Sequence, residues 1–358
     1  STFCTSYVAY IVPGCKLTPY GSLYQGTGFK TSDVDCFVQI PIQYNTLDDT
    51  LVNTARDILS RRPDVFAQLF AATNVPVPIV KFYHLPTSRE CDLTFDCPPG
   101  VHNSRLLWYI LNLDERALNL AVIVKYWAKV HNFTGPYLLR TYALILMVIF
   151  YLQQLDILPT VQRLQRNVPY APWRIWNAAF DKPALTNYNQ SSLKQLLGGF
   201  LLFFSTYNFE ENIISPFVGH SISRECFRRI SDVPKEFTLY KNNLKRKICE
   251  PLKLDTPMCV QDVFNHSSNC SVGVLPELSQ NIRECFRLAA KLYEKESDEC
   301  FLNAILTMQY SRECVALASN FKDTYSNLYL LFGKVELEGD LIESCFLKMF
   351  YKLIFKCL

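Results

Sequence analysis

The sequence predicts an α+β fold, and two observations lead to that prediction. The first 105 residues alternate short strand-like runs with one helical stretch, expected around residues 46–72. From Leu106 onward, apolar side chains recur with the 3.6-residue period of a helix. The chain has 358 residues, of which 49% are hydrophobic, so we expect a large core and two domains, at 1–105 and 106–358.

Near the start of the chain, a Gly21-Ser22 turn is followed by Asp33 and Asp35, which lead into an apolar run predicted to be a strand. Residues i and i+2 of a strand point to the same face, so the two carboxylates are expected to lie together. Adjacent carboxylates repel each other, and a bound divalent cation, Mg²⁺ or Mn²⁺, relieves that repulsion. Backbone N–H groups of the turn suit phosphate oxygens. The motif therefore indicates a phosphoryl-transfer site.

A third carboxylate, Asp92, is predicted on a nearby strand. Two β-rich runs, 77–85 and 91–95, are separated by a turn-like segment at 86–89. Asp92 lies among apolar residues, where an unpaired ionised carboxylate is costly, so a metal or cationic partner is expected. The alternative is an edge-strand side chain that faces water.

The remainder of the chain predicts mainly helices. They are expected at 104–111, 116–129, 140–152, 193–209, 278–296, 299–320 and from 339, with a loop-rich segment at 234–274 and a strand at 328–332. The longest apolar run, 142–152, is shorter than the roughly 20 residues that span a bilayer. We therefore expect a buried core helix there and no membrane partner.

Charge and cysteine content limit the class of protein. The net charge is only +3, so any contact with nucleic acid must use local basic patches. The 14 cysteines include no C-x-x-C pair, which argues against a zinc ribbon and favours reduced thiols. Reduced, buried thiols are typical of a cytosolic protein, so we expect a cytoplasmic protein, and we see no charged-then-apolar signal-peptide pattern. The candidate RNA-binding patches, which also fit ordinary solvated surface, are Arg61-Arg62 and Lys241 with Lys245-Arg246-Lys247.

The segment 19–40 resembles the signature of the nucleotidyltransferase superfamily that includes DNA polymerase β and the poly(A) polymerases. Four further segments, 100–107, 124–129, 141–152 and 203–207, occur in the order found in non-canonical poly(A) polymerases and terminal uridylyltransferases, or poly(U) polymerases. This resemblance covers roughly residues 19–274. It implies a bilobed enzyme, with a small mixed β-sheet in the catalytic lobe and a mainly helical lobe that holds the nucleotide.

The resemblance also implies roles for individual residues. Asp33, Asp35 and Asp92 are expected to bind two metal ions. Lys125 and Lys129 are four residues apart, hence on one helix face, and are expected to contact the triphosphate, although a solvated face has the same pattern. The other residues implied to contact nucleotide are Gly21, Ser22, Asn103, Ser104, Thr141 and Tyr142. Without the resemblance, Asn103 would be read as a helix N-cap and Tyr142 as a core aromatic residue.

Base recognition is expected in the segment 260–269. Family members that transfer uridylate usually have a histidine six residues after the aspartate that corresponds to Asp262, followed by an asparagine. In this chain Ser268 occupies that position, Asn269 follows it, and His266 lies two residues earlier. A loop shift could bring His266 to uracil, whereas Ser268 would leave room for adenine.

We therefore expect a template-independent nucleotidyltransferase that adds uridylates from UTP to the 3′ end of single-stranded RNA by two-metal catalysis. A poly(A) polymerase that uses ATP is the alternative. An inactive RNA-binding scaffold and a sensor that makes oligoadenylate or a cyclic dinucleotide are further readings, and the intact carboxylates argue against the scaffold.

Overall fold

The computed structural model describes residues 14–41, 49–73, 75, 77–95, 98–135, 138–183 and 187–308. The chain divides into two compact units. Unit 1 comprises residues 1–118, 158–187 and 263–265, and unit 2 comprises 119–157, 188–262 and 266–358. The strand predicted at 328–332 and the helix predicted from 339 lie outside the described residues. The domain boundary expected near residue 105 stays a prediction.

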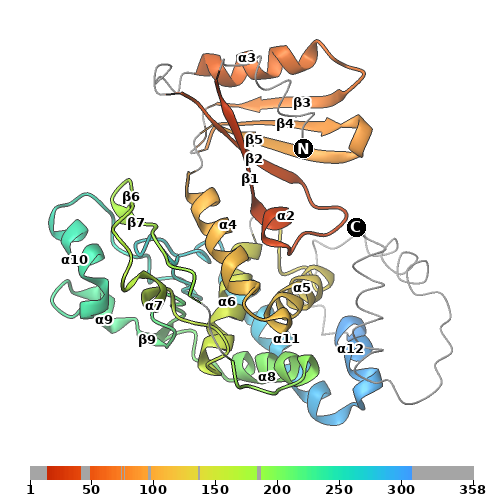
Figure 1. The fold of residues 1–358 in the computed structure, drawn as a ribbon. Helices are drawn as coiled ribbons and strands as arrows, with labels where there is room; N and C mark the ends of the chain where they lie inside the picture. Colours follow the sequence, from red (N-terminus) through yellow and green to blue (C-terminus); the bar gives the residue numbers. More distant parts are fainter. Residues whose placement is uncertain are drawn as a thin grey trace. The chain divides into compact units, whose positions relative to one another are not determined.

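Unit 1 is built on a sheet of five strands in the order β1-β2-β5-β4-β3 (Figure 1). The pair β2–β5 is parallel, and the other three pairs are antiparallel, so the sheet is mixed as expected. The strands are β1 (Lys16–Tyr20), β2 (Val34–Gln39), β3 (Phe66–Ala72), β4 (Ile79–His84) and β5 (Arg89–Thr94). A short 3₁₀ turn, η2 (Leu85–Thr87), joins β4 to β5. The predicted strand pair around Asp92 is confirmed.

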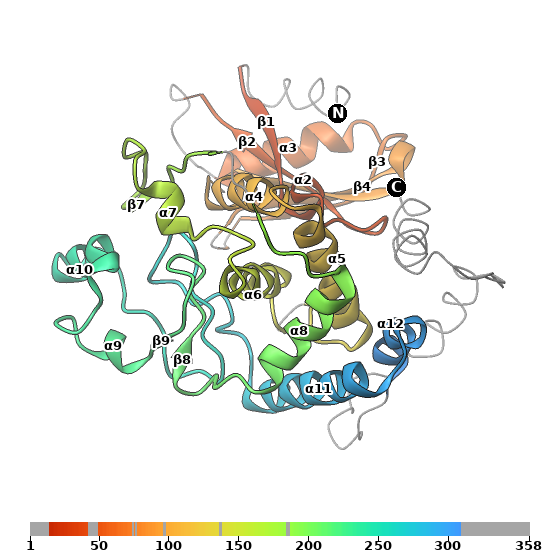
Figure 2. The same ribbon diagram turned by 60° about the horizontal axis from the view of Figure 1, so that its bottom comes forward.

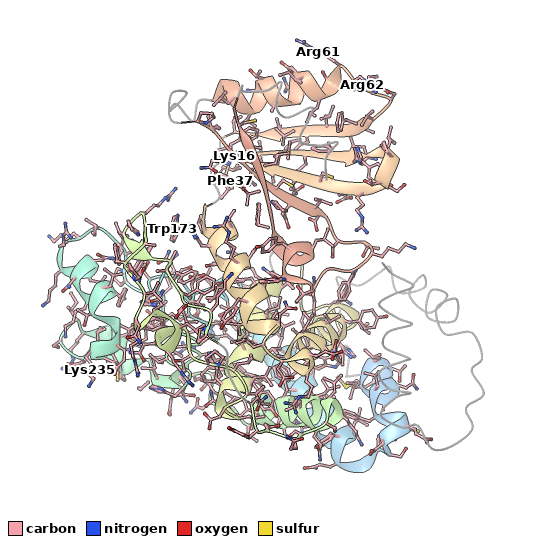
Figure 3. The ribbon with its side chains drawn as sticks, in the orientation of Figure 1. Lys16, Phe37, Arg61, Arg62, Trp173 and Lys235 are labelled. Carbon is pink, nitrogen blue, oxygen red and sulfur yellow. The ribbon has the colours of Figure 1, made fainter. Side chains whose placement is uncertain are left out.

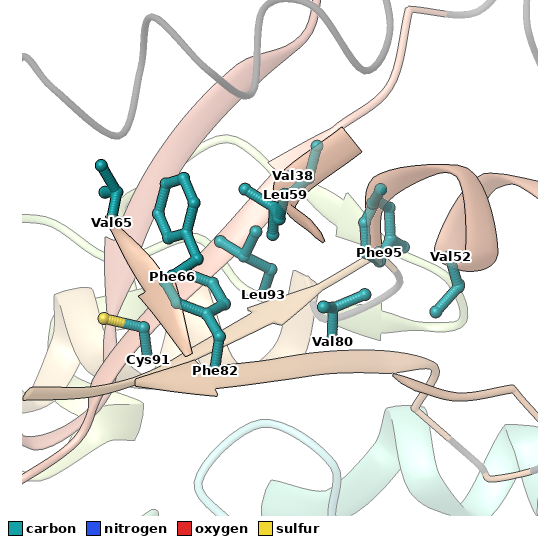
Figure 4. Packing of buried hydrophobic residues seen from close by; sticks show 11 residues of the cluster. Val38, Val52, Leu59, Val65, Phe66, Val80, Phe82, Cys91, Leu93 and Phe95 are labelled. Atoms are coloured by element: carbon teal, nitrogen blue, oxygen red, sulfur yellow. The ribbon is translucent and has the colours of Figure 1, made fainter. Parts of the chain in front are cut away.

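Strand alternation gives the sheet two chemically different faces. One face packs against helix α3 (Asp49–Ser60), which contributes Val52, Ala55 and Leu59 to the core (Figures 1 and 4). The sheet side of this core is apolar and comprises Val38, Phe66, Val80, Phe82, Cys91, Leu93 and Phe95. Because Cβ atoms alternate along a strand, Asp35, Lys81 and Asp92 belong to the opposite face.

The prediction of one helix over residues 46–72 is wrong for the second half of that range. Helix α3 ends at Ser60, and residues 66–72 form the edge strand β3, which pairs with β4. Pro63 lies between these elements and cannot continue a helix, because its ring fixes φ and it lacks an N–H group. The chain turns through hydrogen bonds from the Val65 and Phe66 N–H groups to the Arg62 carbonyl, at 3.0 and 2.9 Å.

The rest of the described part of unit 1 contains two short helices, one longer helix and a small β-hairpin. They are α2 (Gly21–Gln25), α4 (Pro98–Leu111), α7 (Val161–Gln165), β6 (Pro172–Trp173) and β7 (Trp176–Asn177). Helix α4 begins at Pro98, so Asn103 lies inside the helix and is not its N-cap. The alternative reading of Asn103 is therefore wrong.

Unit 2 is mainly helical, as the periodicity predicts. Its elements, with α5 shared with unit 1, are α5 (Glu115–Val130), α6 (Thr141–Gln154), α8 (Leu193–Ser205), β8 (Asn212–Ile213), β9 (Ile222–Ser223), α9 (Glu225–Arg228), η3 (Lys235–Phe237), α10 (Thr238–Lys245), α11 (Pro276–Lys295) and α12 (Asp298–Thr307). Helix α6 is buried from Ala143 to Gln153, which confirms the predicted core helix. Helices α8 and α11 pack side by side (Figure 2). Helix α10 lies within the segment that was predicted to be loop-rich.

The state of the cysteines and the length of the apolar helices were both predicted from the sequence. Nine cysteines lie among these residues, and all nine are free thiols, as predicted. None of the described helices is long and apolar enough to cross a membrane.

Candidate metal and nucleotide site

Two of the three predicted carboxylates, Asp35 and Asp92, lie in one row of residues that crosses all five strands of the sheet. Tyr20 on β1 pairs with Asp35 on β2, and Asp35 pairs with Asp92 on β5. Asp92 pairs with Lys81 on β4, and Lys81 pairs with Phe70 on β3. Backbone register thus fixes which side chains meet, because directly paired residues on one face have adjacent Cβ atoms.

Asp33, Asp35 and Asp92 come together as the sequence predicts. One carboxylate oxygen from each lies within 4.8 Å of the others. Asp33 precedes β2 and is exposed, Asp35 is half-buried, and Asp92 is buried. Three converging carboxylate oxygens are a donor set that suits a hard divalent cation. The residues present therefore fit divalent metal binding.

Gly21 approaches the site so closely that a larger residue there would displace the Asp35 carboxylate. Its φ of +73° lies in the left-handed region, and an added Cβ atom would lie 1.9 Å from Asp35 Oδ2. The Gly21 N–H donates to Ser104 Oγ at 2.8 Å, and Gln25 Nε2 donates to the same oxygen at 3.2 Å. Ser104 on α4 thus anchors the α2 turn beside Asp35. The expected phosphate contacts of Gly21 and Ser22 stay a prediction.

Lys81 is a site residue that sequence reasoning missed. Its ammonium donates a short hydrogen bond to Asp92 Oδ2. Burial opposes the charge of Lys81, but the bond to Asp92 and the charges of the carboxylates outweigh it and raise the pKa of Lys81. Burial raises the pKa of Asp92, and Lys81 offsets this only in part. A raised pKa for both Lys81 and Asp92 is the result expected where three carboxylates lie around one ammonium group. The sequence signal that could have identified Lys81 is a lysine at an alternate position of a strand-like run, on the face opposite the apolar residues.

The nucleotide residues predicted in unit 2 lie on α5 and at the start of α6. Lys125 and Lys129 are one helical turn apart on α5, where Lys125 is buried and Lys129 is exposed. Thr141 is the first residue of α6, as predicted. The Tyr142 hydroxyl donates to Asp262 Oδ2 at 3.0 Å. The structure thus joins two predicted base-contacting residues, Tyr142 and Asp262, within this unit.

The segment 258–271, called the Asp262 loop below, is held by its own hydrogen bonds. The Asp262 N–H donates to the Ser268 carbonyl at 3.0 Å, and the Cys270 N–H donates to the Val260 carbonyl at 2.7 Å. The Asn269 amide oxygen accepts from the N–H groups of Val260 and Ser271, at 3.2 and 2.9 Å. Its amide nitrogen donates to acceptors of Lys253, Thr256 and Met258 at 3.0–3.1 Å. Asn269 therefore organises the loop, and its contact with a base stays a prediction.

His266 is buried in an aromatic pocket of unit 2, with 5% of its surface exposed. Its ring centroid lies 4.2 Å from that of Phe217 and 5.1 Å from that of Phe237. The His266 carbonyl accepts from Gln261 Nε2 at 2.9 Å. The predicted loop shift would have to withdraw the ring from this pocket. Ser268, by contrast, is half-buried.

The side chains of the two predicted basic patches differ in their contacts with the protein; Figure 3 labels Arg61 and Arg62 of the first patch. Arg62 forms a bidentate ion pair with Asp64, at 2.7 and 2.6 Å, next to the exposed Arg61. Lys241 donates to the Ser231 carbonyl at 3.0 Å. The side chains of Lys245, Arg246 and Lys247 are all exposed. Their contact with RNA stays a prediction.

Comparison with known proteins gives a consistent set of relatives. Residues 4–112 match the family model "Poly(A) RNA polymerase, mitochondrial-like, central palm domain". The zebrafish (Danio rerio) protein "Poly(A) RNA polymerase GLD2" is 29% identical over 260 residues, which are 68% of this chain and 52% of that protein. Human "Terminal uridylyltransferase 7" is 29% identical over 229 residues, or 59% of this chain and 15% of that protein. The chain thus spans about half, or less, of these relatives.

Solved structures share the fold. A crystal structure of mtPAP in complex with UTP has a TM-score of 0.70 at 20% identity, covering 84% of this chain and 66% of that one. The MgGTP-bound structure of the Cid1 poly(U) polymerase has a TM-score of 0.69 at 21% identity, covering 85% of this chain and 90% of that one. Both neighbours are nucleotidyltransferases, so the mixed sheet and the helices form a nucleotidyltransferase fold.

Proposed function

We propose that this chain, which is similar to non-canonical poly(A) polymerases and terminal uridylyltransferases, extends the 3′ end of single-stranded RNA without a template. The observation that supports this most strongly is the convergence of Asp33, Asp35 and Asp92, each of which has a carboxylate oxygen within 4.8 Å of the others. Intact carboxylates at this point also argue against an inactive scaffold.

In the proposed reaction, the RNA 3′-hydroxyl loses its proton to water and its oxygen bonds to the α-phosphorus of a nucleoside triphosphate. The bond between the α-phosphorus and the α–β bridging oxygen breaks, and pyrophosphate leaves with that oxygen. Divalent cations would supply charge stabilisation for the attacking oxygen and for the leaving pyrophosphate. Asp33, Asp35 and Asp92 would hold those cations at fixed positions. Gly21 would keep the backbone close to Asp35 without displacing the carboxylate.

The residues for the triphosphate are assigned from the family resemblance. We assign Ser22, Lys125, Lys129 and Thr141 to this contact. Asn103 would contact the ribose, and Tyr142 would stack on the base while its hydroxyl remains bonded to Asp262. Replacing the exposed Lys129 by alanine should raise the KM for nucleotide more than the KM for RNA.

A direct assay tests the activity. The purified protein is incubated with a labelled single-stranded RNA, Mg²⁺ or Mn²⁺, and one nucleoside triphosphate at a time. Extension of the RNA supports the proposal, and the Asp35→Ala variant, which lacks a central carboxylate, should leave the RNA unchanged. Absence of extension with every nucleotide and both metals would refute it.

For the donor we propose UTP. Uracil presents two carbonyl acceptors on either side of an N3–H donor, and the Asp262 carboxylate is an acceptor suited to that N–H. Terminal uridylyltransferase 7 is among the relatives, and a poly(U) polymerase is among the proteins with this fold. These observations support uridylyl transfer.

ATP is the second candidate, and a specific observation favours it. The His266 ring is packed between Phe217 and Phe237, while the small side chain of Ser268 occupies the position where uridylyl-transferring relatives usually have histidine. Several relatives, including the GLD2 protein of zebrafish, are named as poly(A) RNA polymerases. A small residue at this position would leave room for a purine.

The ratio of kcat/KM for UTP to that for ATP separates the two donors. A wild-type ratio above one supports UTP, and a ratio below one replaces the uridylyl proposal by the adenylyl one. Ser268→His places an imidazole at the usual position and should raise the ratio, whereas Ser268→Ala is the matched control and should not. If Ser268→His leaves the ratio unchanged, this loop position does not set base choice.

A further inference from the structure

A stripe of alternating aromatic and cationic side chains follows α4 and the residues packed beside it in unit 1. It consists of Trp173 from the β6–β7 hairpin, His102, Arg105 and Trp108 from α4, and Lys182, and is called the α4 stripe below. Figure 3 labels Trp173 at the hairpin. None of these residues contributes to the carboxylate site or to the two basic patches.

Distances between side chains and helix geometry connect the members of the stripe. The rings of Trp173 and His102 have centroids 6.4 Å apart. Arg105 and Trp108 follow His102 at intervals of three residues, and side chains at that spacing are neighbours on a helix surface. Lys182 Nζ lies 5.7 Å from the centroid of the Trp108 ring and completes the stripe.

The elements that carry the stripe are firmly held. Gln165 Nε2 donates to the carbonyls of Asn177 and Ala179, at 2.9 Å each, and the Asn177 side-chain oxygen accepts the Ala179 N–H at 3.1 Å. On the other side, the Tyr109 hydroxyl donates to the Pro183 carbonyl at 2.9 Å and so fixes the segment of Lys182 to α4. The stripe is therefore a preformed surface.

The stripe is accessible and carries positive charge. Trp108 is 41% exposed, which is unusual for so large an aromatic residue, and Arg105 and Lys182 are exposed as well. The neighbouring carboxylate, Asp181, accepts the backbone N–H of Lys182 at 2.7 Å. Trp173 is half-buried. An exposed and a partly exposed aromatic ring with cations beside them match the chemistry of a nucleic-acid strand, whose bases stack and whose phosphates are anionic.

We propose that the α4 stripe is a binding track for single-stranded RNA, with bases stacked on Trp108 and Trp173 and phosphates held by Arg105 and Lys182. Its position supports this occupant, because Ser104 on the same helix bonds the Gly21 N–H beside Asp35. RNA whose 3′ end lies at the carboxylates would thus lie close to α4. The inference rests on the proposed function and specifies how that site holds its acceptor.

Equilibrium binding of a fluorescently labelled single-stranded RNA, without nucleotide, tests the track by anisotropy. Trp108→Ala should raise the Kd about tenfold, since stacking of one base contributes about 1–3 kcal/mol. Trp108→Phe keeps an aromatic face and should restore most of the affinity. Arg105→Glu should weaken binding and reduce the dependence of log Kd on log salt concentration. Lys291→Glu, the same charge change on an exposed position of α11, is the matched control.

The outcomes are distinguishable from those of the activity assay. Wild-type affinity in Trp108→Ala, Arg105→Glu and Lys182→Glu together would overturn the inference, and that surface would then belong to another class of partner. Lys182 is exposed, so we expect the Lys182→Glu variant to fold. It keeps the test valid if the Trp108→Ala variant does not fold. A protein that binds RNA through the stripe yet adds no nucleotide would refute the proposed function and leave this inference intact.

Discussion

The carboxylate site on the sheet and the Asp262 loop both hold polar groups at fixed positions, but they do so by different means. On the sheet, the β2–β5 and β4–β5 register places Asp35, Asp92 and Lys81 side by side. Three carboxylates meet one ammonium there, so negative charge is left over. In the loop, Asn269 and Ser271 direct their hydrogen bonds back to the loop and to the segment before it.

This difference separates groups that are available to a ligand from groups that serve the protein. Excess negative charge on the sheet is costly by itself and is compensated only when a cation binds. Buried polar groups whose hydrogen bonds are already made gain little from a ligand and lose much when removed. We therefore expect substitutions at the carboxylates to affect activity before stability, and substitutions of Asn269 to affect stability first.

The largest expected effect is loss of activity in Asp35→Asn. An amide keeps the shape of the side chain but supplies neither the charge nor the second anionic oxygen that a divalent cation requires. Extension should fall by more than about a thousandfold, while the midpoint of thermal unfolding should stay equal or rise because repulsion between carboxylates is relieved. Activity is measured by RNA extension and stability by thermal unfolding. Retained extension would remove Asp35 from the site.

Gly21→Ala tests how closely the backbone must approach Asp35. The new methyl group would lie 1.9 Å from Asp35 Oδ2, so the carboxylate must move. We expect kcat to fall about 10- to 100-fold, because a displacement of about 1 Å costs that much in a positioned site. Gly26→Ala is the matched control. Its φ of +81° imposes similar backbone strain, but its Cβ atom would make only ordinary contact with Leu118, at 3.5 Å. Equal losses in both variants would attribute the effect to strain alone.

The same difference explains how much of the molecule could be predicted from the sequence. Asp33 and Asp35 could be placed because they precede a strand with an interval of two, and strand alternation has a fixed period. Asp92 could be predicted as a site residue because it lies among apolar residues, where an ionised carboxylate needs a partner. Lys81 was missed because its partner depends on the pairing of β4 with β5, which no local pattern reveals. The strand β3 was missed because the run after Pro63 also fits a helical period, and only its pairing with β4 decides.

The Asp262 loop could be predicted far less well. Its sequence offers several polar residues, and residue type alone does not tell which of them bond within the protein. Asn269 was expected to contact a base, yet its amide is surrounded by five partners from the protein. His266 was expected at the nucleotide, and its packing against Phe217 depends on residues almost fifty positions away. Tertiary contacts of this kind are not encoded in local periodicity.

Asn269→Ala should destabilise the protein by about 2–4 kcal/mol, because the N–H groups and carbonyls that the amide satisfies would remain buried. Ser268→Ala is the neighbouring control and should change the free energy of unfolding by less than about 0.5 kcal/mol. Denaturant unfolding measures both. If Asn269→Ala is as stable as the wild type and instead changes the selectivity between UTP and ATP, the amide contacts the base and the contrast between the two regions fails.

The smallest expected effect is stabilisation of the folded protein by a bound metal ion, and it tests the net negative charge of the carboxylate site. A ligand that binds only the folded state stabilises it by RT ln(1 + [L]/Kd), or about 2.7 kcal/mol at a hundredfold excess over Kd. Mg²⁺ should therefore raise the unfolding midpoint by several degrees, and EDTA should reverse the shift. Asp33→Asn, at an exposed carboxylate, should abolish most of that shift without lowering the midpoint of the metal-free protein. Ser268→Ala should retain the full shift, since its loop lacks the excess negative charge. A shift of equal size in all three proteins would show that the cation binds elsewhere, and the carboxylates would lose their assigned role.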